Sequence, residues 1–498
     1  RKMYFQAILD YNRIFKEVHD LNIMFLYNQE QYDINGPTTL FSSLPQRKQG
    51  VAGRVSYSYD GRYYIEGNFG YNGSENFAKG HRWGFFPSIA LGYNISEESF
   101  FEPLRKVITS MKLRGSWGLV GNDQIGGERF IYMPTINLSG KGFTTGIDQN
   151  YGLSGPVYTR YENNSITWEV GEKINLGIDL QLLNSLNIVV DIFRETRRDI
   201  FQKKGTIPTY LGTGNTDVFG NLAEMKNQGL DLSIDYNKAF SKDFYMNFKG
   251  TFTYAHNEIT KYDEAPKYAF QSKVGQSANV SQGYLSNGLF LDEAEIDRYN
   301  QQMGSTLGAG DIKYLNVSNM HGYGDDIVDV DDWTWIGNPT VPEIVYGFGP
   351  SFKYKNWDFS FFFQGVAKTS LFMSGFHPFG DNSLRNVLQF VANDRWSPTN
   401  QNVDAKYPRL TRKTSLNNTN PGNSGRTSDY WMRDGSFLKL KNMELGYTFK
   451  RMRFYISGSN LLTFSKFDLW DPEQGGGSGL KYPTQRVFNV GFQMTFNN

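Results

Sequence analysis

Apolar and polar residues alternate along many segments of this chain. At its C-terminal end, Phe488, Val490, Phe492, Met494 and Phe496 alternate with Asn489, Gly491, Gln493 and Thr495. A period of two residues is the signature of a β-strand with one apolar face. A segment of about ten such residues suits a tilted strand that shows one face to lipid and the other to a water-filled lumen. An aromatic residue so close to the end of the chain indicates the closing strand of a β-barrel.

The same alternation predicts about sixteen strands. They lie near residues 2–13, 19–30, 49–60, 62–72, 85–94, 109–119, 128–138, 172–182, 187–196, 228–238, 243–256, 343–354, 357–368, 436–449, 452–464 and 485–497. Several are ten or more residues long, whereas strands of soluble β-sandwiches usually have about five or six. We therefore predict an all-β fold, a transmembrane antiparallel β-barrel, in preference to a large soluble sandwich such as a lectin.

Short and long connections between these strands tend to alternate. Tight turns are predicted at Asp60-Gly61, Asn184-Ser185, Ser241-Lys242 and Lys355-Asn356. Long connections are predicted near 139–171, 197–227, 257–342 and 369–435. Short turns at one rim and long loops at the other are typical of outer-membrane barrels, whose long loops are extracellular.

The two longest loops exceed the length of simple connectors, so we expect them to carry function. Each contains a predicted short helix, near Asp292–Met303 in the first loop and near Leu384–Trp396 in the second. Both loops also contain Trp, Tyr and Gly residues. We expect the two loops to fold over the mouth of the barrel.

Composition supports a membrane barrel over a helical membrane protein. The chain of 498 residues contains 39 Phe and 31 Tyr, and aromatic residues make up 16% of it. Mean hydropathy is −0.51, and the sequence has no apolar run long enough for a transmembrane helix. A barrel gives no such run, because every second residue of each strand faces the lumen.

Charge and motifs exclude several other functions. The net charge of +1 gives no basic excess for nucleic-acid binding. The absence of cysteine excludes disulfides, thiolate metal sites and cysteine nucleophiles. No phosphate-binding loop, nucleophile elbow, HExxH or dinucleotide fingerprint is present, and the five histidines are scattered. We therefore predict that the protein is not an enzyme.

Several short motifs follow one another in the order seen in one family. They are Gly50–Tyr64 (GVAGRVSYSYDGRYY), Arg82–Ser88 (RWGFFPS), Lys112–Gly118 (KLRGSWG) with Gly121-Asn122, Thr167–Glu169 with Asn175–Asp179, Lys226–Asp231, Ile336–Pro339, Leu438–Asn442 with Leu445–Tyr447, and Asp471–Glu473. Each motif is weak alone, but together they make the chain resemble the SusC/RagA-type TonB-dependent outer-membrane transporters from about residue 50 to the end.

This resemblance implies a fold and a function. It implies that residues 1–498 form the C-terminal part of a plugged barrel of about 22 strands, with the plug domain outside this chain. It implies active import of oligosaccharides together with a SusD-like surface lipoprotein, driven by the TonB complex, and a dimer of such pairs. Peptide import by the same fold, a passive porin of about 16 strands and an adhesive surface protein remain alternatives. Since a barrel must be exported and the chain opens in a strand at Arg1, we expect it to be part of a longer polypeptide.

Two groups of loop residues are candidates for binding. Five aromatic residues could stack on sugar rings or pack the loops: Trp333, Trp335, Trp396, Tyr430 and Trp431. Members of the family often show a calcium-binding run where this chain has HGYGDDIVDVDD, residues 321–332. His321 and Tyr323 replace ligands there, so that Asp325, Asp329 and Asp332 would remain as carboxylates for Ca²⁺, or else form a solvated acidic loop. Asp179, Asp231, Asp235 and Asp358 are expected to line the lumen as a polar wall.

Overall fold

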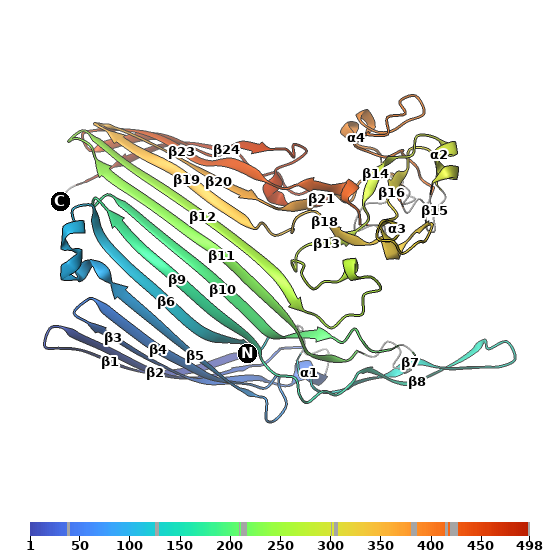
Figure 1. The fold of residues 1–498 in the computed structure, drawn as a ribbon, viewed down its shortest axis with the longest axis horizontal. Helices are drawn as coiled ribbons and strands as arrows, with labels where there is room; N and C mark the ends of the chain where they lie inside the picture. The colour runs from blue at the N-terminus through green and yellow to red at the C-terminus, as the bar shows by residue number, and fades with distance from the viewer. Residues whose placement is uncertain are drawn as a thin grey trace. The chain divides into compact units, whose positions relative to one another are not determined.

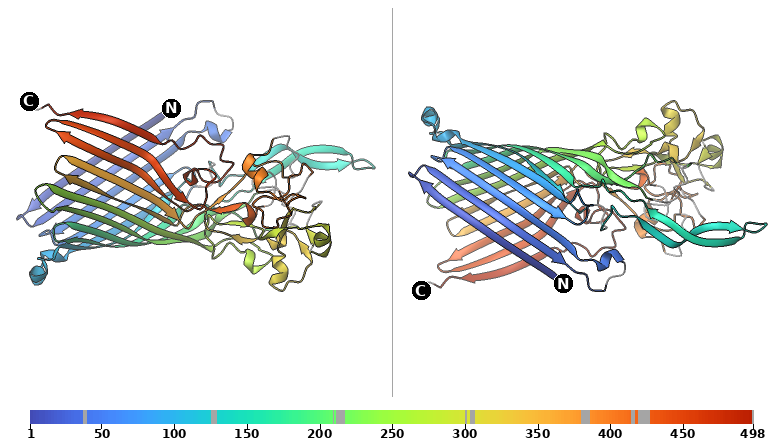
Figure 2. Two further views of the ribbon diagram at one scale, coloured as in Figure 1. Left: turned by 90° about the horizontal axis from the view of Figure 1, so that it is seen from above. Right: turned by 90° about the horizontal axis from the view of Figure 1, so that it is seen from below.

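The computed structural model describes residues 1–36, 40–124, 129–208, 210, 217–299, 301–302, 307–379, 386–413, 417–418 and 427–496. The chain divides into two compact units, each described by itself. Unit 1 comprises residues 1–234, 255–265 and 273–275, and unit 2 comprises residues 235–254, 266–272 and 276–498. Figure 1 shows the ribbon, and Figure 2 shows it from two further sides.

The main element is one antiparallel sheet of fifteen strands. Its order is β1-β2-β3-β4-β5-β6-β9-β10-β11-β12-β19-β20-β23-β24-β25. In unit 1 these are β1 (Lys2–Phe15), β2 (His19–Tyr32), β3 (Gln46–Tyr59), β4 (Tyr63–Ser74), β5 (Trp83–Asn94), β6 (Ile108–Asn122), β9 (Glu169–Leu182) and β10 (Leu186–Lys203). In unit 2 they are β19 (Ile344–Tyr354), β20 (Trp357–Ala367), β23 (Phe437–Phe449), β24 (Met452–Ser465) and β25 (Val487–Met494), while β11 (Phe219–Ala239) and β12 (Phe244–Lys261) have residues in both units.

Fifteen of the sixteen predicted strands are confirmed as members of this sheet. The prediction for residues 128–138 is wrong, because β6 pairs directly with β9 from Asn122↔Glu169 onward and the intervening chain leaves the sheet. There β7 (Thr135–Thr145) and β8 (Tyr151–Arg160) pair with each other as a separate hairpin. Phe130 has a φ of 51°, which turns the backbone out of an extended path.

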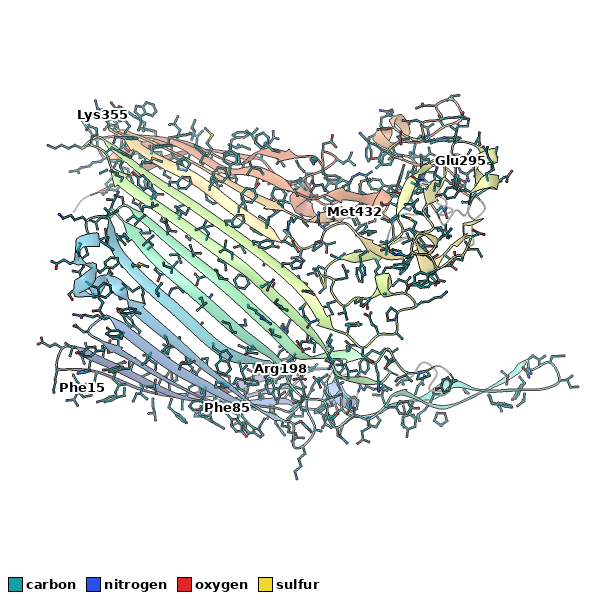
Figure 3. All side chains as sticks on the ribbon, in the orientation of Figure 1. Phe15, Phe85, Arg198, Glu295, Lys355 and Met432 are labelled. Carbon is teal, nitrogen blue, oxygen red and sulfur yellow. The ribbon has the colours of Figure 1, made fainter. Side chains whose placement is uncertain are left out.

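The strands of the sheet have one apolar and one polar face. On β4, Ile65 and Phe69 are 45% and 38% exposed, and they alternate with the partly buried Glu66 and Asn68. Side chains on both faces of the strands are drawn in Figure 3, where Phe15 lies at the turn end of β1. An apolar face left exposed over many strands is the arrangement that a lipid environment requires.

The predicted tight turns are confirmed. Asp60 and Gly61 both have positive φ between β3 and β4, and Leu183 and Asn184 do so between β9 and β10. The helices are short: α1 (Leu40–Ser43), α2 (Glu293–Arg298), α3 (Val317–Met320) and α4 (Gln389–Asn393). The predicted helices near Asp292–Met303 and Leu384–Trp396 correspond to α2 and α4, and parts of both predictions lie outside the described residues. Over the residues described, no helix is both long and apolar enough to cross a membrane.

The long loops of unit 2 build their own hydrophobic core. Short strand pairs brace them: β13 (Ser281–Gly283) with β18 (Thr334–Ile336), β14 (Ser286–Leu289) with β16 (Ile312–Tyr314), β15 (Gln301–Gln302) with β17 (Ile327–Val328), and β21 (Ser370–Phe372) with β22 (Met432–Asp434). The core contains buried residues of both loops, among them Tyr284, Tyr314, Phe379, Trp396 and Trp431. The two loops therefore fold together as one packed body, in which Figure 3 labels Glu295 of α2.

Candidate functional site

The polar face of unit 1 carries an arginine that crosses a neighbouring strand. Arg114 of β6 reaches Asp179 of β9 at 2.8 Å and Asp191 of β10 at 3.0 Å. Between them, in register with both Arg114 and Asp191, lies Gly177. A Cβ at this glycine would lie 2.8 Å from the Arg114 guanidinium carbon and 2.6 Å from an Asp191 carboxylate oxygen, so only glycine leaves room for the side chain to pass.

Unit 2 repeats this arrangement with different residues. Arg453 of β24 donates from Nε to Asp358 of β20 at 2.9 Å and from Nη2 to Glu444 of β23 at 2.6 Å. Gly446 is the register partner of Asp358, and a Cβ there would lie 2.6 Å from the Arg453 Nη2 atom. Each arginine thus meets two carboxylates, which leaves each cluster one negative charge in excess.

The expected polar wall can be placed from these contacts. Asp179 and Asp358 lie on the polar face, where each binds an arginine. Asp231 and Asp235 lie on β11 and are partly buried. Charged groups that are paired and hydrogen-bonded in this way suit a face in contact with water.

The five aromatic candidates of the loops do not form one surface. Trp396 and Trp431 lie inside the loop core, and Tyr430 donates a hydrogen bond to the backbone oxygen of Ala405 at 2.7 Å. Trp335 donates from its indole nitrogen to the backbone oxygen of Ser272 at 2.9 Å, and Trp333, which is 36% exposed, packs edge-to-face on Tyr284. Trp396, Tyr430 and Trp431 therefore pack in or against the loop core. Contact of any of the five aromatic residues with a ligand stays a prediction.

A different group of rings gathers on the surface of the first of these loops, residues 257–342. Tyr268 and Tyr323 have ring centroids 4.1 Å apart, and Phe270 stacks on His321 at 4.5 Å with 13° between the rings. Tyr323 is 49% exposed. We call these four residues the ring cluster. Sequence reasoning missed it because its halves are about fifty residues apart, although His321 and Tyr323 had been noted as aromatic replacements of metal ligands.

The acidic residues beside the ring cluster are occupied by the chain itself. Asp332 is buried and accepts hydrogen bonds from the backbone N–H groups of Ser318 at 2.9 Å and Asp329 at 2.7 Å. Burial raises the pKa of Asp332 against the lowering effect of these bonds. Asp325 accepts from Asn316 at 3.1 Å, and Asp329 accepts from the N–H of Asp331 at 2.8 Å.

Within the described ranges, no group of three or more His, Asp or Glu side chains is arranged to hold a metal ion. Asp329 and Asp332 instead form a capping box around the turn of residues 330–332, and Asp325 accepts from the backbone N–H of Ile327 at 3.2 Å. Calcium at this loop stays a prediction.

Two buried charge networks fix the loops. Asp311 is fully buried. Its carboxylate accepts hydrogen bonds from Nε and Nη2 of Arg409, the latter at 2.9 Å, and from the side-chain amide of Asn418 at 2.6 Å. Since Asp311 and Arg409 come from different loops, this pair joins the two loops. Lys439 of β23, also fully buried, binds Asp471 and, at 2.8 Å, Glu473 of the connection between β24 and β25.

Comparison with known proteins gives consistent matches. Residues 3–461 match the family described as TonB dependent receptor-like, beta-barrel. The TonB-dependent receptor P3 of Formosa agariphila is 27% identical over 483 residues, which are 90% of this chain and 45% of the receptor. The TonB-dependent receptor SusC of Bacteroides thetaiotaomicron is 28% identical over 471 residues, 89% of this chain and 43% of SusC. The chain thus spans about half the length of these curated relatives.

A solved structure, that of the RagAB peptide transporter, superimposes with a TM-score of 0.72 at 20% identity. The superposition covers 99% of this chain and 55% of the solved one. At this identity the likeness establishes the fold alone, that of the wall of a β-barrel.

Proposed function

Since the chain belongs to the TonB-dependent receptor-like β-barrel family of the outer membrane, we propose that it is the wall and loop portion of a SusC-like importer of oligosaccharides. Transport by such a protein is driven by TonB, and the rest of a barrel of about 22 strands, with its plug, comes from outside these residues. The observation that carries the choice of substrate is the ring cluster on the long loops of unit 2.

Chemistry of the ring cluster favours sugars. The C–H faces of a pyranose pack well on aromatic rings, which are large, apolar and rigid. The Lys267 ammonium lies 5.2 Å from the Tyr268 ring centroid and pairs with Asp331, so donors and acceptors for sugar hydroxyls lie beside the rings. The arginine–carboxylate clusters of the wall offer further paired polar groups to a neutral, hydroxyl-rich solute.

Titration calorimetry with oligosaccharides and with peptides of similar size tests the proposal. We expect heat of binding from at least one class of oligosaccharide. Heat from peptides alone would replace oligosaccharides by peptides as the cargo. A strain in which the gene is deleted is expected to lose uptake of the bound oligosaccharide, and undiminished uptake would contradict an import function.

Replacing Tyr323 by alanine is expected to weaken oligosaccharide binding by about 2- to 13-fold. The estimate follows from about 0.5–1.5 kcal/mol for one aromatic stacking contact. Tyr323→Phe keeps the ring and should bind nearly as well as the parent. Tyr482→Ala removes a tyrosine that is 79% exposed outside the cluster and serves as the matched control. Equal loss in the Tyr323 and Tyr482 variants would exclude a specific role of the ring cluster.

The β7–β8 hairpin supports a lid partner, which we propose to be a SusD-like surface lipoprotein. The hairpin extends away from the sheet strands of unit 1 in Figures 1 and 2. Leu138, Phe143 and Ile147 on it are 78%, 72% and 103% exposed. An isolated two-stranded hairpin is marginally stable in water, and large exposed apolar side chains mark interaction surfaces. A partner that covers them would stabilise the hairpin.

The double variant Phe143→Ser with Ile147→Ser is expected to lower co-purification of the lipoprotein by about tenfold or more, since each buried anchor side chain contributes about 1 kcal/mol or more to an interface. The control is Leu183→Ser, in the β9–β10 turn at the opposite end of the strands, where 60% of the side chain is exposed. Undiminished co-purification of the double variant would show that the hairpin is not part of the interface with the lipoprotein.

A further inference from the structure

One connection in unit 1 differs from its neighbours. The turns β1–β2, β3–β4 and β9–β10 have three residues each, whereas β5 and β6, which turn at the same end of the strands, are joined by residues 95–107. We call residues 95–107 the rim segment. It forms two short 3₁₀ helices, η1 (Ile95–Glu97) and η2 (Ser99–Leu104). Figure 1 draws them at the end of the strands where the short turns lie.

Hydrogen bonds place the rim segment on the outer, apolar side of the sheet. Glu98 accepts from the hydroxyls of Tyr63 at 2.5 Å and Tyr93 at 3.3 Å, and Arg62 pairs with it at 3.5 Å. Tyr63 lies on the same face of β4 as the exposed Ile65 and Phe69. The rings of Tyr63 and Tyr93 stack at 5.2 Å. The segment is therefore fixed beside a row of tyrosines that borders the apolar face.

The rim segment is held firmly yet shows apolar side chains to its surroundings. Phe101 is buried, and Arg105 donates to the backbone oxygen of Ser96 at 2.7 Å. In contrast, Phe100, Leu104 and Val107 are 67%, 52% and 56% exposed. A fixed backbone that presents three large apolar side chains outward matches an element that lies in a membrane interface.

We propose that Phe100, Leu104 and Val107 insert into the phospholipid interface of the leaflet on the short-turn side, which in outer-membrane barrels is the periplasmic one. The occupant is lipid because the segment continues the apolar face that lipid already covers. Its neighbours Tyr63 and Tyr93 are of the residue type that collects at headgroup level. Glu97 and Glu102 are exposed as well. With Glu98, which pairs with Arg62, and with Arg105 and Lys106, they give residues 95–107 a formal charge of −1, so insertion depends on the apolar side chains.

The proposal is tested with an environment-sensitive label. Because the chain has no cysteine, Phe100→Cys places a single thiol in it for a nitrobenzoxadiazole fluorophore. The labelled chain, assembled with the rest of its barrel, is measured in phospholipid nanodiscs that contain lipids with a nitroxide near the headgroup or deep in the acyl chain. We expect a blue-shifted emission and stronger quenching by the shallow nitroxide. Leu104→Cys serves as an independent second position.

The control is Ile147→Cys at the tip of the β7–β8 hairpin, where we expect emission typical of water and no quenching. Emission typical of water at residues 100 and 104 would overturn the proposal. A blue shift that neither nitroxide quenches would overturn it too, since protein would then cover the segment. No substrate or lipoprotein is needed, so failure of the proposed import function leaves this result unaffected.

Discussion

Asp311→Ala is expected to loosen the loop body of unit 2 by about 3–5 kcal/mol, the usual cost of removing one partner from a buried ion pair. Asp311 is fully buried, and its removal would leave the Arg409 guanidinium and the Asn418 amide without their acceptor. Because Asp311 and Arg409 belong to different loops, both loops should open together. Hydrogen exchange of residues 286–320 and 403–413 in the intact protein measures this.

The wall strands provide an internal reference for this experiment, since their exchange should not change. Asp297→Ala removes an exposed carboxylate from α2 and should have almost no effect. Adding Arg409→Met to Asp311→Ala should recover part of the lost protection, because it removes the uncompensated charge. Unchanged protection in Asp311→Ala would show that the pair does not join the loops.

Lys439→Met is expected to release the connection between β24 and β25 at a cost of about 2–3 kcal/mol. The value is below that for a fully buried network, because 35% of the Glu473 side chain is exposed and water screens its share. Lys439 itself is enclosed, so its loss leaves Asp471 without its cation, while Glu473 keeps Lys441. A nitroxide label at Leu480→Cys, which is 77% exposed in the parent, should show increased mobility by electron paramagnetic resonance.

The pairing of Lys439 with Asp471 and Glu473, here called the lysine clamp, should depend on pH. Burial raises the pKa of Asp471 and of Glu473, but hydrogen bonds outweigh it, and both pKa values are lowered. These bonds come from Lys439 to both carboxylates, from the backbone N–H of Glu473 to Asp471, and from Lys441 to Glu473. A lowered carboxylate pKa gives stability that is present above the ordinary value of about 4 and is lost as the pH falls through the lowered value. The label at residue 480 should therefore become mobile in acid in the parent, and this dependence should shrink in Lys439→Met.

Lys466→Met is the matched control for Lys439→Met. Lys466 lies in the same connection, but 88% of its side chain is exposed and its carboxylate partner Asp434 is 3.9 Å away. Removing it should leave both the mobility and its pH dependence as in the parent. Equal mobility in the two methionine variants would contradict the prediction that Lys439 holds the connection between β24 and β25.

The sheet could be predicted from sequence because each wall strand records its own environment. Leu176, Ile178 and Leu180 face one side and Asp179 the other, and a period of two residues is visible without knowledge of any partner strand. Residues 128–138 show the limit of this reasoning. Alternation also occurs in a strand that pairs outside the sheet, and pairing is not written in the local pattern.

The loop body could not be predicted, since its contacts join distant residues. Trp396 and Trp431 are of a residue type common at ligand-binding surfaces, yet both are buried in a hydrophobic core that is built from two loops. The ring cluster depends equally on Tyr268 and Phe270 meeting His321 and Tyr323. The local sequence carries one signal: residues 321–332 depart from the acidic metal-binding run of the family. That departure argues against a metal site, but it does not predict that His321 and Tyr323 pack on other rings.

In the part of the chain that the structure describes, β1 and β25 are the two edge strands of the fifteen-stranded sheet. Each edge offers a row of backbone N–H and C=O groups, and hydrocarbon tolerates no such unpaired row. In the proposed barrel of about 22 strands, strands from outside these residues would pair with both edges, so we expect insertion into the bilayer and closure of the ring to be one event. Two separately made fragments of that barrel are then expected to enter lipid only when they are supplied together.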